Sequence, residues 1–138
     1  MKVISIREPY ATLIAEGFKR IETRSWKTNY RGELFIHASC KSISKQTLEN
    51  KYLKKIVKNL DMSYGSIICR CNLIDCIYMN VDFLKNIAED LQEYNLGDYQ
   101  LGRYAWILED VEPIYPILAR GRLNIWNFEA KYILKNED

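Results

Sequence analysis

The chain has 138 residues, of which 48% are hydrophobic and 28% are charged. This length and balance are typical of one globular domain with one core, and they exclude a disordered chain. The formal net charge is +2, so binding to nucleic acid would require a local cluster of basic side chains. The longest apolar runs in the sequence are too short to span a membrane.

The first part of the chain predicts a strand, a helix and two further strands. Hydrophobic and polar residues alternate over residues 3–6 and 20–25, which is the pattern of strands with two different faces, and residues 34–38 predict a third strand. After the first strand, Pro9 is suited to the first position of a helix. Gly17 predicts the end of this helix, because glycine readily adopts the left-handed conformation found there.

The middle of the chain predicts a long helix, a long strand and a second helix. Residues 44–60 carry apolar residues at helical spacing, and these form one stripe: Leu48, Tyr52, Leu53, Ile56, Val57 and Leu60. The lysines of this helix form either a solvated face or a basic contact surface: Lys45, Lys51, Lys54, Lys55 and Lys58. Residues 66–78 predict a central strand, and Asp82 is a good N-cap for a helix that continues to Tyr94.

The last part predicts three strands, over residues 104–111, 114–120 and 125–128. Strands then outnumber helices, and most connections are too short for parallel crossovers. The sequence therefore predicts an α+β fold, a mostly antiparallel β-barrel with flanking helices. We expect a single domain over residues 1–134 and a loose tail over residues 135–138.

The cysteines indicate neither a metal site nor a redox motif. No pair among Cys40, Cys69, Cys71 and Cys76 has the Cys-x-x-Cys spacing, and the chain has one histidine. We interpret all four as small buried residues in a reducing compartment, and we expect no metal and no cofactor. The N-terminal residues lack the apolar core of a signal peptide, which predicts a cytoplasmic location.

Basic and aromatic residues gather between residues 19 and 31. The basic ones are Lys19, Arg20, Arg24, Lys27 and Arg31. Glu22 is the one acid among them, and Trp26 and Tyr30 lie between them in the sequence. The two rings are either stacking platforms for nucleic-acid bases or a core tryptophan and a turn tyrosine.

Glu22 and Arg24 are two residues apart on a predicted strand, so they share one face, and Lys19 lies just before it. If this face lines a cleft, the three charges need one another, because an unpaired buried charge costs several kcal/mol. Arg24 then offers a planar fork for a carboxylate, a phosphate or a base edge, and Glu22 holds a cation or acts as a general base. The alternative is a solvated set of surface ion pairs.

Three other features bear on the core or on a possible binding site. Trp106 and Trp126 lie in apolar strands and are expected in the core. His37, between Ile36 and Ala38, is expected to be a hydrogen-bonded core histidine. Gly97 and Gly102 bracket a loop that contains Asp98 and Tyr99 and is followed by Arg103. This loop is either the rim of a binding site or a simple turn.

Several segments, taken in their order along the chain, resemble the motifs of one protein family. Residues 17–24 match the pattern Gly-x-Lys-x-x-Glu-x-Arg, which is the signature of the ASCH family. The other matching segments span nearly the whole chain: residues 4–11, 25–32, 36–39, 73–76, 97–106 and 114–126. The sequence departs from the usual family pattern in the first segment, where Glu8 and Tyr10 replace Gln and Trp.

The resemblance implies a PUA-like barrel with a cleft between the first helix and the barrel. ASCH domains are thought to bind RNA, and some relatives are amidohydrolases that remove the acetyl group from N4-acetylcytidine. In those relatives a Lys occupies the position of Lys19, and a Thr nucleophile occupies the position of Glu22. A carboxylate cannot simply replace that hydroxyl, which favours binding over catalysis in this chain.

Three functions are therefore considered. The first is binding of single-stranded RNA or a modified nucleotide without catalysis, through these residues: Tyr10, Lys19, Glu22, Arg24, Ser25, Trp26, Tyr30, Arg31 and Arg103. The second is a hydrolase, an amidohydrolase on an acylated pyrimidine or else a nuclease, with Lys19 and Glu22 as the candidate catalytic residues. The third is a contact with a protein partner through residues 44–60.

Overall fold

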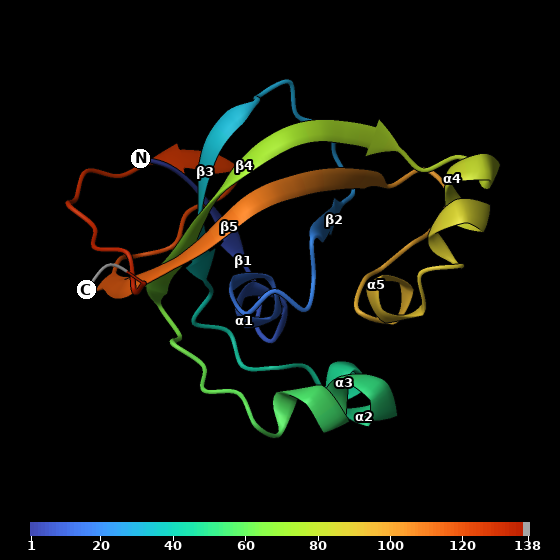
Figure 1. The fold of residues 1–138 in the computed structure, drawn as a ribbon, viewed down its shortest axis with the longest axis horizontal. Helices are drawn as coiled ribbons and strands as arrows, with labels where there is room; N and C mark the ends of the chain where they lie inside the picture. The colour runs from blue at the N-terminus through green and yellow to red at the C-terminus, as the bar shows by residue number, and fades with distance from the viewer. Residues whose placement is uncertain (137–138) are drawn as a thin grey trace.

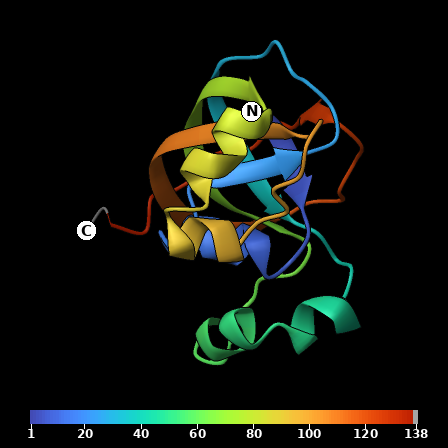
Figure 2. The same cartoon turned by 90° about the vertical axis from the view of Figure 1, so that its right-hand side faces the viewer.

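A strongly curled sheet of six strands forms the centre of the molecule (Figures 1 and 2). The computed structural model describes residues 1–136. The strands are β1 (Lys2–Ile6), β2 (Ile21–Arg24), β3 (Gly32–Ala38), β4 (Ser66–Tyr78), β5 (Tyr104–Leu118) and β6 (Ile125–Asn127). The helices in this range are α1 (Tyr10–Ala15), α2 (Lys45–Glu49), α3 (Lys51–Val57), α4 (Val81–Ile87) and α5 (Leu91–Asn95).

The strand order is β2-β5-β4-β3-β1-β6. Among the strands of residues 1–136, only β1 and β3 pair in parallel, and the segment with α1 and β2 connects them. The sheet remains open, with β2 and β6 at its edges, so it is a half-barrel. The predicted α+β, mostly antiparallel PUA-like fold with flanking helices is confirmed.

The strands predicted over residues 104–111 and 114–120 are in fact one strand, β5. Its pairing with β4 shifts register at three places, and Pro113 lies opposite Cys69 next to one of these irregularities. A bulge accommodates a proline because it interrupts the regular hydrogen bonding that a proline cannot join. The bulges also bend the paired strands, which allows the two longest strands to curl around the core.

Two helix predictions were wrong because asparagine side chains cap helices at other positions. The single helix predicted over residues 44–60 is broken at Asn50, whose side chain accepts hydrogen bonds from the backbone N–H groups of Tyr52 and Leu53 and so begins α3. The N-cap of α4 is Asn80 and not Asp82. A second interruption follows at Asp90, whose side chain caps α5.

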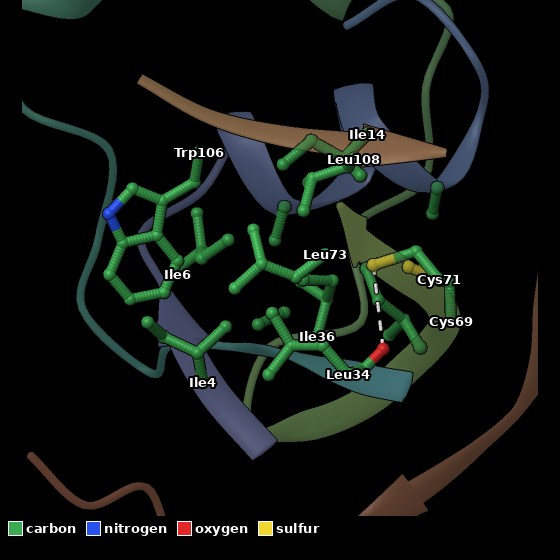
Figure 3. Close-up of a cluster of buried hydrophobic side chains, with 14 residues drawn as sticks. Ile4, Ile6, Ile14, Leu34, Ile36, Cys69, Cys71, Leu73, Trp106 and Leu108 are labelled. Carbon is green, nitrogen blue, oxygen red and sulfur yellow. Dashed lines mark hydrogen bonds between the residues drawn. The ribbon is translucent and has the colours of Figure 1, made fainter. Parts of the chain in front are cut away.

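Side chains from β1, β3, β4 and β5 fill the inner face of the curled sheet (Figure 3). Trp106, Leu73, Ile36 and Ile4 lie in this one cluster and are fully buried, as predicted. Helix α1 closes the open side, because it contacts β3, β4 and β5 and buries Ile14 in the same cluster. The predicted burial of Trp126 and His37 is also confirmed.

The cysteines differ from one another. Cys69 and Cys71 are buried in the main core, and burial raises the pKa of the Cys71 thiol to about 12. Cys76 is half-buried, and Cys40 is exposed, which contradicts the prediction of burial for all four. Cys40 lies after β3, in the connection to α2, where the chain has left the sheet.

A smaller apolar cluster ties the helices to the sheet. Leu13 of α1, Leu53 of α3 and Leu96 after α5 pack together, while the α2–α3 pair projects from one side of the molecule (Figures 1 and 2). The backbone N–H of Lys135 donates to the carbonyl of Pro113, and residues 137–138 of the expected tail lie outside the described residues. Across residues 1–136, no helix is long and apolar enough to cross a membrane.

Candidate functional site

The turn after α1 directs Lys19 into the protein. Gly17 has a φ of +83°, the left-handed conformation that its position predicted. The backbone N–H groups of Phe18 and Lys19 then both donate to the carbonyl of Leu13. This tight turn ends the helix and leaves the Lys19 side chain only 1% exposed.

Glu93 is the counter-charge of Lys19. Its Oε2 lies 3.4 Å from Lys19 Nζ and accepts a hydrogen bond of 3.0 Å from the Tyr99 hydroxyl. Its Oε1 accepts from the backbone N–H of Arg20 at 2.7 Å. Burial lowers the pKa of the Lys19 ammonium, and the negative charges of Glu93 and Glu22 oppose that shift. An ammonium this deeply buried needs such a partner.

The backbone at Gly97 completes the enclosure of this pair. A Cβ atom at Gly97 would collide with the Tyr99 ring and would lie 3.1 Å from Lys19 Nζ. The Tyr10 and Tyr99 ring centroids lie 5.9 Å and 5.8 Å from the same nitrogen. Lys19 is therefore surrounded by two rings, a carboxylate and a close backbone, and the loop after α5 needs a glycine at this point.

Glu22 and Arg24 form the second charged pair, on β2. Arg24 Nε lies 3.3 Å from Glu22 Oε2, without the alignment of a hydrogen bond. Arg24 Nη2 donates to the carbonyl of Ser5 at 2.6 Å, and Glu22 Oε1 accepts from the backbone N–H of Thr23. Both oxygens of Glu22 are thus engaged inside the protein, and its carboxylate orients Arg24.

These groups line one cavity of about 440 Å³, which we call the motif cavity. Lys19, Glu22 and Arg24 lie on its wall together with Ser25 and Arg103. Arg103 is held there by hydrogen bonds from Nη2 to the carbonyl of Thr23 and from Nε to the carbonyl of Asp98. The volume is within the range of small-molecule sites in proteins.

Tyr10 and Trp26 also line the motif cavity. The ring of Trp26 packs edge-on against Trp106, with centroids 4.8 Å apart and an interplanar angle of 88°. Trp26 is half-buried, so it combines the two roles that the sequence left open: it packs on the core and also faces the cavity. An aromatic ring supported in this way is a rigid surface for stacking.

Two residues of the predicted site lie elsewhere. Tyr30 packs on the core and donates from its hydroxyl to the carbonyl of Glu33. Arg31 donates to the carbonyls of Thr28 and Tyr30 and pairs with Asp75 at 3.7 Å. Neither lines the motif cavity, because the chain turns away from β2 before residue 30 and enters β3.

Glu8, which departs from the usual family pattern, does not line the motif cavity. It is 1% exposed and accepts hydrogen bonds from both the backbone N–H and the hydroxyl of Thr12. Burial raises the pKa of the Glu8 carboxyl, and the hydrogen bonds from Thr12 oppose that shift. Its role is to hold the start of α1.

Glu8 should make folding stability depend on pH. The folded state keeps the Glu8 proton to a higher pH than the unfolded chain, whose pKa is 4.5. The stabilisation is therefore fully present below 4.5 and is lost as the pH rises through the higher folded value. We expect wild type to gain stability relative to Glu8→Gln as the pH falls from neutral, measured by urea unfolding. Parallel profiles for the two proteins would contradict this.

The sequence did not predict Glu93, nor the contributions of Arg7, Ser44 and Thr47 to the cavity wall. The one local signal for Glu93 is its place three residues after Asp90, whose side chain accepts from the Glu93 N–H as in a helix cap. That signal predicts a helix start and not a partner for Lys19. Across residues 1–136, no group of three or more His, Cys, Asp or Glu side chains is placed to hold a metal ion.

Comparison with known proteins agrees with the motif and the fold. A family model described as "ASCH domain" matches residues 4–118. The chain belongs to the ASCH domain family. This ASCH domain is 27% identical to "Activating signal cointegrator 1" of Homo sapiens and of Mus musculus over 93% of its own length. It spans only 22% of the length of each of those proteins.

Solved structures of ASCH proteins share the fold. The crystal structure of ASCH from Zymomonas mobilis superimposes with a TM-score of 0.53 at 20% identity, covering 85% of this chain and 72% of that one. A mutant form of the same Zymomonas mobilis protein gives a TM-score of 0.51 at 19% identity, covering 85% and 74%. At this identity the likeness concerns the fold of the ASCH domain alone.

Proposed function

We propose that this ASCH domain binds single-stranded RNA without catalysis, with one base or modified nucleotide in the motif cavity. The observation that carries the proposal is the composition of the cavity wall, which combines the guanidinium-bearing residues Arg24 and Arg103 with the aromatic residues Tyr10 and Trp26. Stacked rings and planar cationic donors are what proteins use to hold unpaired bases and phosphates. Membership of the ASCH family, whose domains are thought to bind RNA, favours the same ligand.

The charges of the site support a binding role. Arg24 is fixed by Glu22 and by the carbonyl of Ser5, so its orientation is set before a ligand arrives. Such preorganisation lowers the entropy that binding costs. The Glu22 oxygens already accept from Thr23 and face Arg24, which favours an orienting role for this carboxylate over attack on a substrate.

Hydrolysis of an acylated pyrimidine nucleoside is the second candidate. The observation in its favour is Lys19, whose buried ammonium has a lowered pKa and lies on the cavity wall. Groups with such shifts are frequent in active sites. Incubation of wild type with N4-acetylcytidine, followed by absorbance, tests it. Turnover that Glu22→Gln abolishes while binding persists would make Glu22 catalytic and would overturn the binding proposal.

Arg24→Ala should weaken the binding of single-stranded RNA by about 1–3 kcal/mol, or roughly 5- to 150-fold, because it removes a charge-assisted donor. Fluorescence anisotropy with a labelled oligonucleotide measures the change. Lys19→Ala should act in the same direction, and Glu22→Gln should weaken binding indirectly, by releasing Arg24.

Arg31→Ala is the matched control, since Arg31 belongs to the same basic segment but lies outside the motif cavity. We expect it to change affinity less than Arg24→Ala does. Equal losses for the two substitutions would indicate a diffuse electrostatic attraction, and the motif cavity would then not be the site.

A further inference from the structure

A second cavity, of about 650 Å³, adjoins the motif cavity and shares Arg7 and Arg24 with it. We call it the arginine cavity. Five cationic side chains line it: Arg7, Arg24, Lys41, Arg120 and Arg122. In the described part of the chain, no aspartate or glutamate lines it, whereas Glu22 and Asp98 line the motif cavity. The arginine cavity is therefore the more positive of the two.

The floor of this cavity is built by neighbouring strands. Ser5 of β1 and His37 of β3 are paired in register. His37 is 1% exposed, and its Nε2 donates to the carbonyl of Ala119 at 2.8 Å. With the proton on Nε2, its Nδ1 accepts from the Ser5 hydroxyl at 3.0 Å. The segment that leaves β5 is thus tied to the middle of the sheet.

Gly121 brings that segment close to the floor. A Cβ atom at Gly121 would lie 3.0 Å from both Ser5 Oγ and His37 Cε1, so a larger residue would push the loop outward. The arginines on either side, Arg120 and Arg122, are exposed and line the same cavity. The fold therefore places one guanidinium group on each side of Gly121, whose position against Ser5 and His37 is fixed.

Among the described residues, these two arginines differ from others of the domain in their ion pairing. Arg70 and Arg103 each lie within 3.5 Å of a carboxylate, but within residues 1–136 neither Arg120 nor Arg122 has an ion pair. Like charges gathered around a cavity repel one another, and an anion between them removes that cost. Guanidinium groups suit phosphate in particular, because their fork matches two of its oxygens.

We propose that the arginine cavity binds a backbone phosphate of the RNA strand whose base occupies the motif cavity, an inference that rests on the proposed function. Arg7 and Arg24 lie on the walls of both cavities, so one strand that passes them reaches both. The ligand class is then an oligonucleotide and not a free nucleoside. This assigns a role to the segment after β5, which lies outside the Gly-x-Lys-x-x-Glu-x-Arg motif.

The test is the salt dependence of binding to a labelled single-stranded RNA oligonucleotide. For single strands, the logarithm of the affinity falls with the logarithm of salt concentration with a slope of about −0.7 per neutralised phosphate. We expect Arg120→Ala/Arg122→Ala to weaken binding at least about tenfold at low salt and to make the slope shallower by roughly 0.7–1.4. The control Lys85→Ala/Lys131→Ala removes the same charge at exposed residues that line neither cavity, and should leave the slope unchanged.

The outcomes separate the inference from the proposed function. If wild type binds no single-stranded RNA, the proposed function fails and the inference fails with it. If wild type binds but the double arginine variant keeps the wild-type affinity and slope, the arginine cavity is not a phosphate site, while the proposed function stands.

Discussion

Replacing Trp106 with alanine is expected to lower the free energy of unfolding by about 3–5 kcal/mol. Trp106 is fully buried and is the largest such side chain in the domain. Its ring packs edge-on against Trp26, and its Nε1 donates to the carbonyl of Trp26 at 3.4 Å. The substitution therefore removes core contacts and also the support of one wall of the motif cavity. Urea unfolding followed by far-ultraviolet circular dichroism measures the change.

Tyr115→Ala is the control for this experiment. Tyr115 lies on the same strand, β5, but its side chain is 52% exposed, and we expect its removal to cost roughly 0.5 kcal/mol or less. Equal unfolding midpoints for Trp106→Ala and wild type would contradict the place of Trp106 at the centre of the core.

The second large effect is expected at Glu93. Glu93→Gln should cost about 3–5 kcal/mol, because it leaves the Lys19 ammonium buried without its ion-pair partner. Glutamine keeps the shape and can still accept from the Arg20 N–H. Adding Lys19→Met should restore part of the loss, since it removes the unpaired charge. A double-mutant cycle of these variants, measured by urea unfolding, gives the coupling between the two residues.

The pH dependence provides a second readout for Glu93. The folded state releases the Lys19 proton at a lower pH than the unfolded chain, whose pKa is 10.5. The unfolded chain therefore binds more protons between those two values, and stability rises with pH in that window. Without Glu93 the pKa of Lys19 falls further, so the cost of Glu93→Gln should shrink as the pH is raised. A cost independent of pH would show that Lys19 does not respond to Glu93.

An exposed ion pair serves as the control for the cycle. Arg31 and Asp75 lie 3.7 Å apart, and their side chains are 38% and 56% exposed. Arg31→Met should cost less than about 1 kcal/mol, because water screens such a pair. Comparable losses at Arg31 and Glu93 would mean that burial of the Lys19–Glu93 pair adds nothing to its importance.

Lys19 and Arg24, two residues of the Gly-x-Lys-x-x-Glu-x-Arg motif, are expected to have different roles. Lys19 is held by Glu93, whereas Arg24 is held by Glu22 and lies on the walls of both cavities. Removing Glu93 is therefore expected to affect mainly folding, and removing Arg24 mainly RNA binding. This separation allows stability and affinity to be measured as independent consequences of substitutions at Glu93 and at Arg24.

Local features of the sequence were sufficient for much of the fold. Alternation predicted β1 and β2 to within a few residues, because a strand with one buried face alternates, and a strand was also predicted over most of β3. Gly17 predicted the end of α1, since few residues other than glycine adopt its φ of +83°. The burial of Trp106 followed from its apolar neighbours, and the family resemblance brought Lys19, Glu22 and Arg24 to attention as a group.

Only the tertiary structure decided which charges meet. Glu93 lies 74 residues after Lys19 in an acidic segment that is exposed on either side, so no local pattern connects the two. Arg31 belongs to the same basic and aromatic segment of the sequence as Arg24, yet the chain turns between them and leaves Arg31 outside the motif cavity. Arg120 and Arg122 reach the sheet only because His37 and Ser5 hold the segment after β5. Periodicity reports which face of an element is buried, whereas a binding site depends on how separate elements pack against one another.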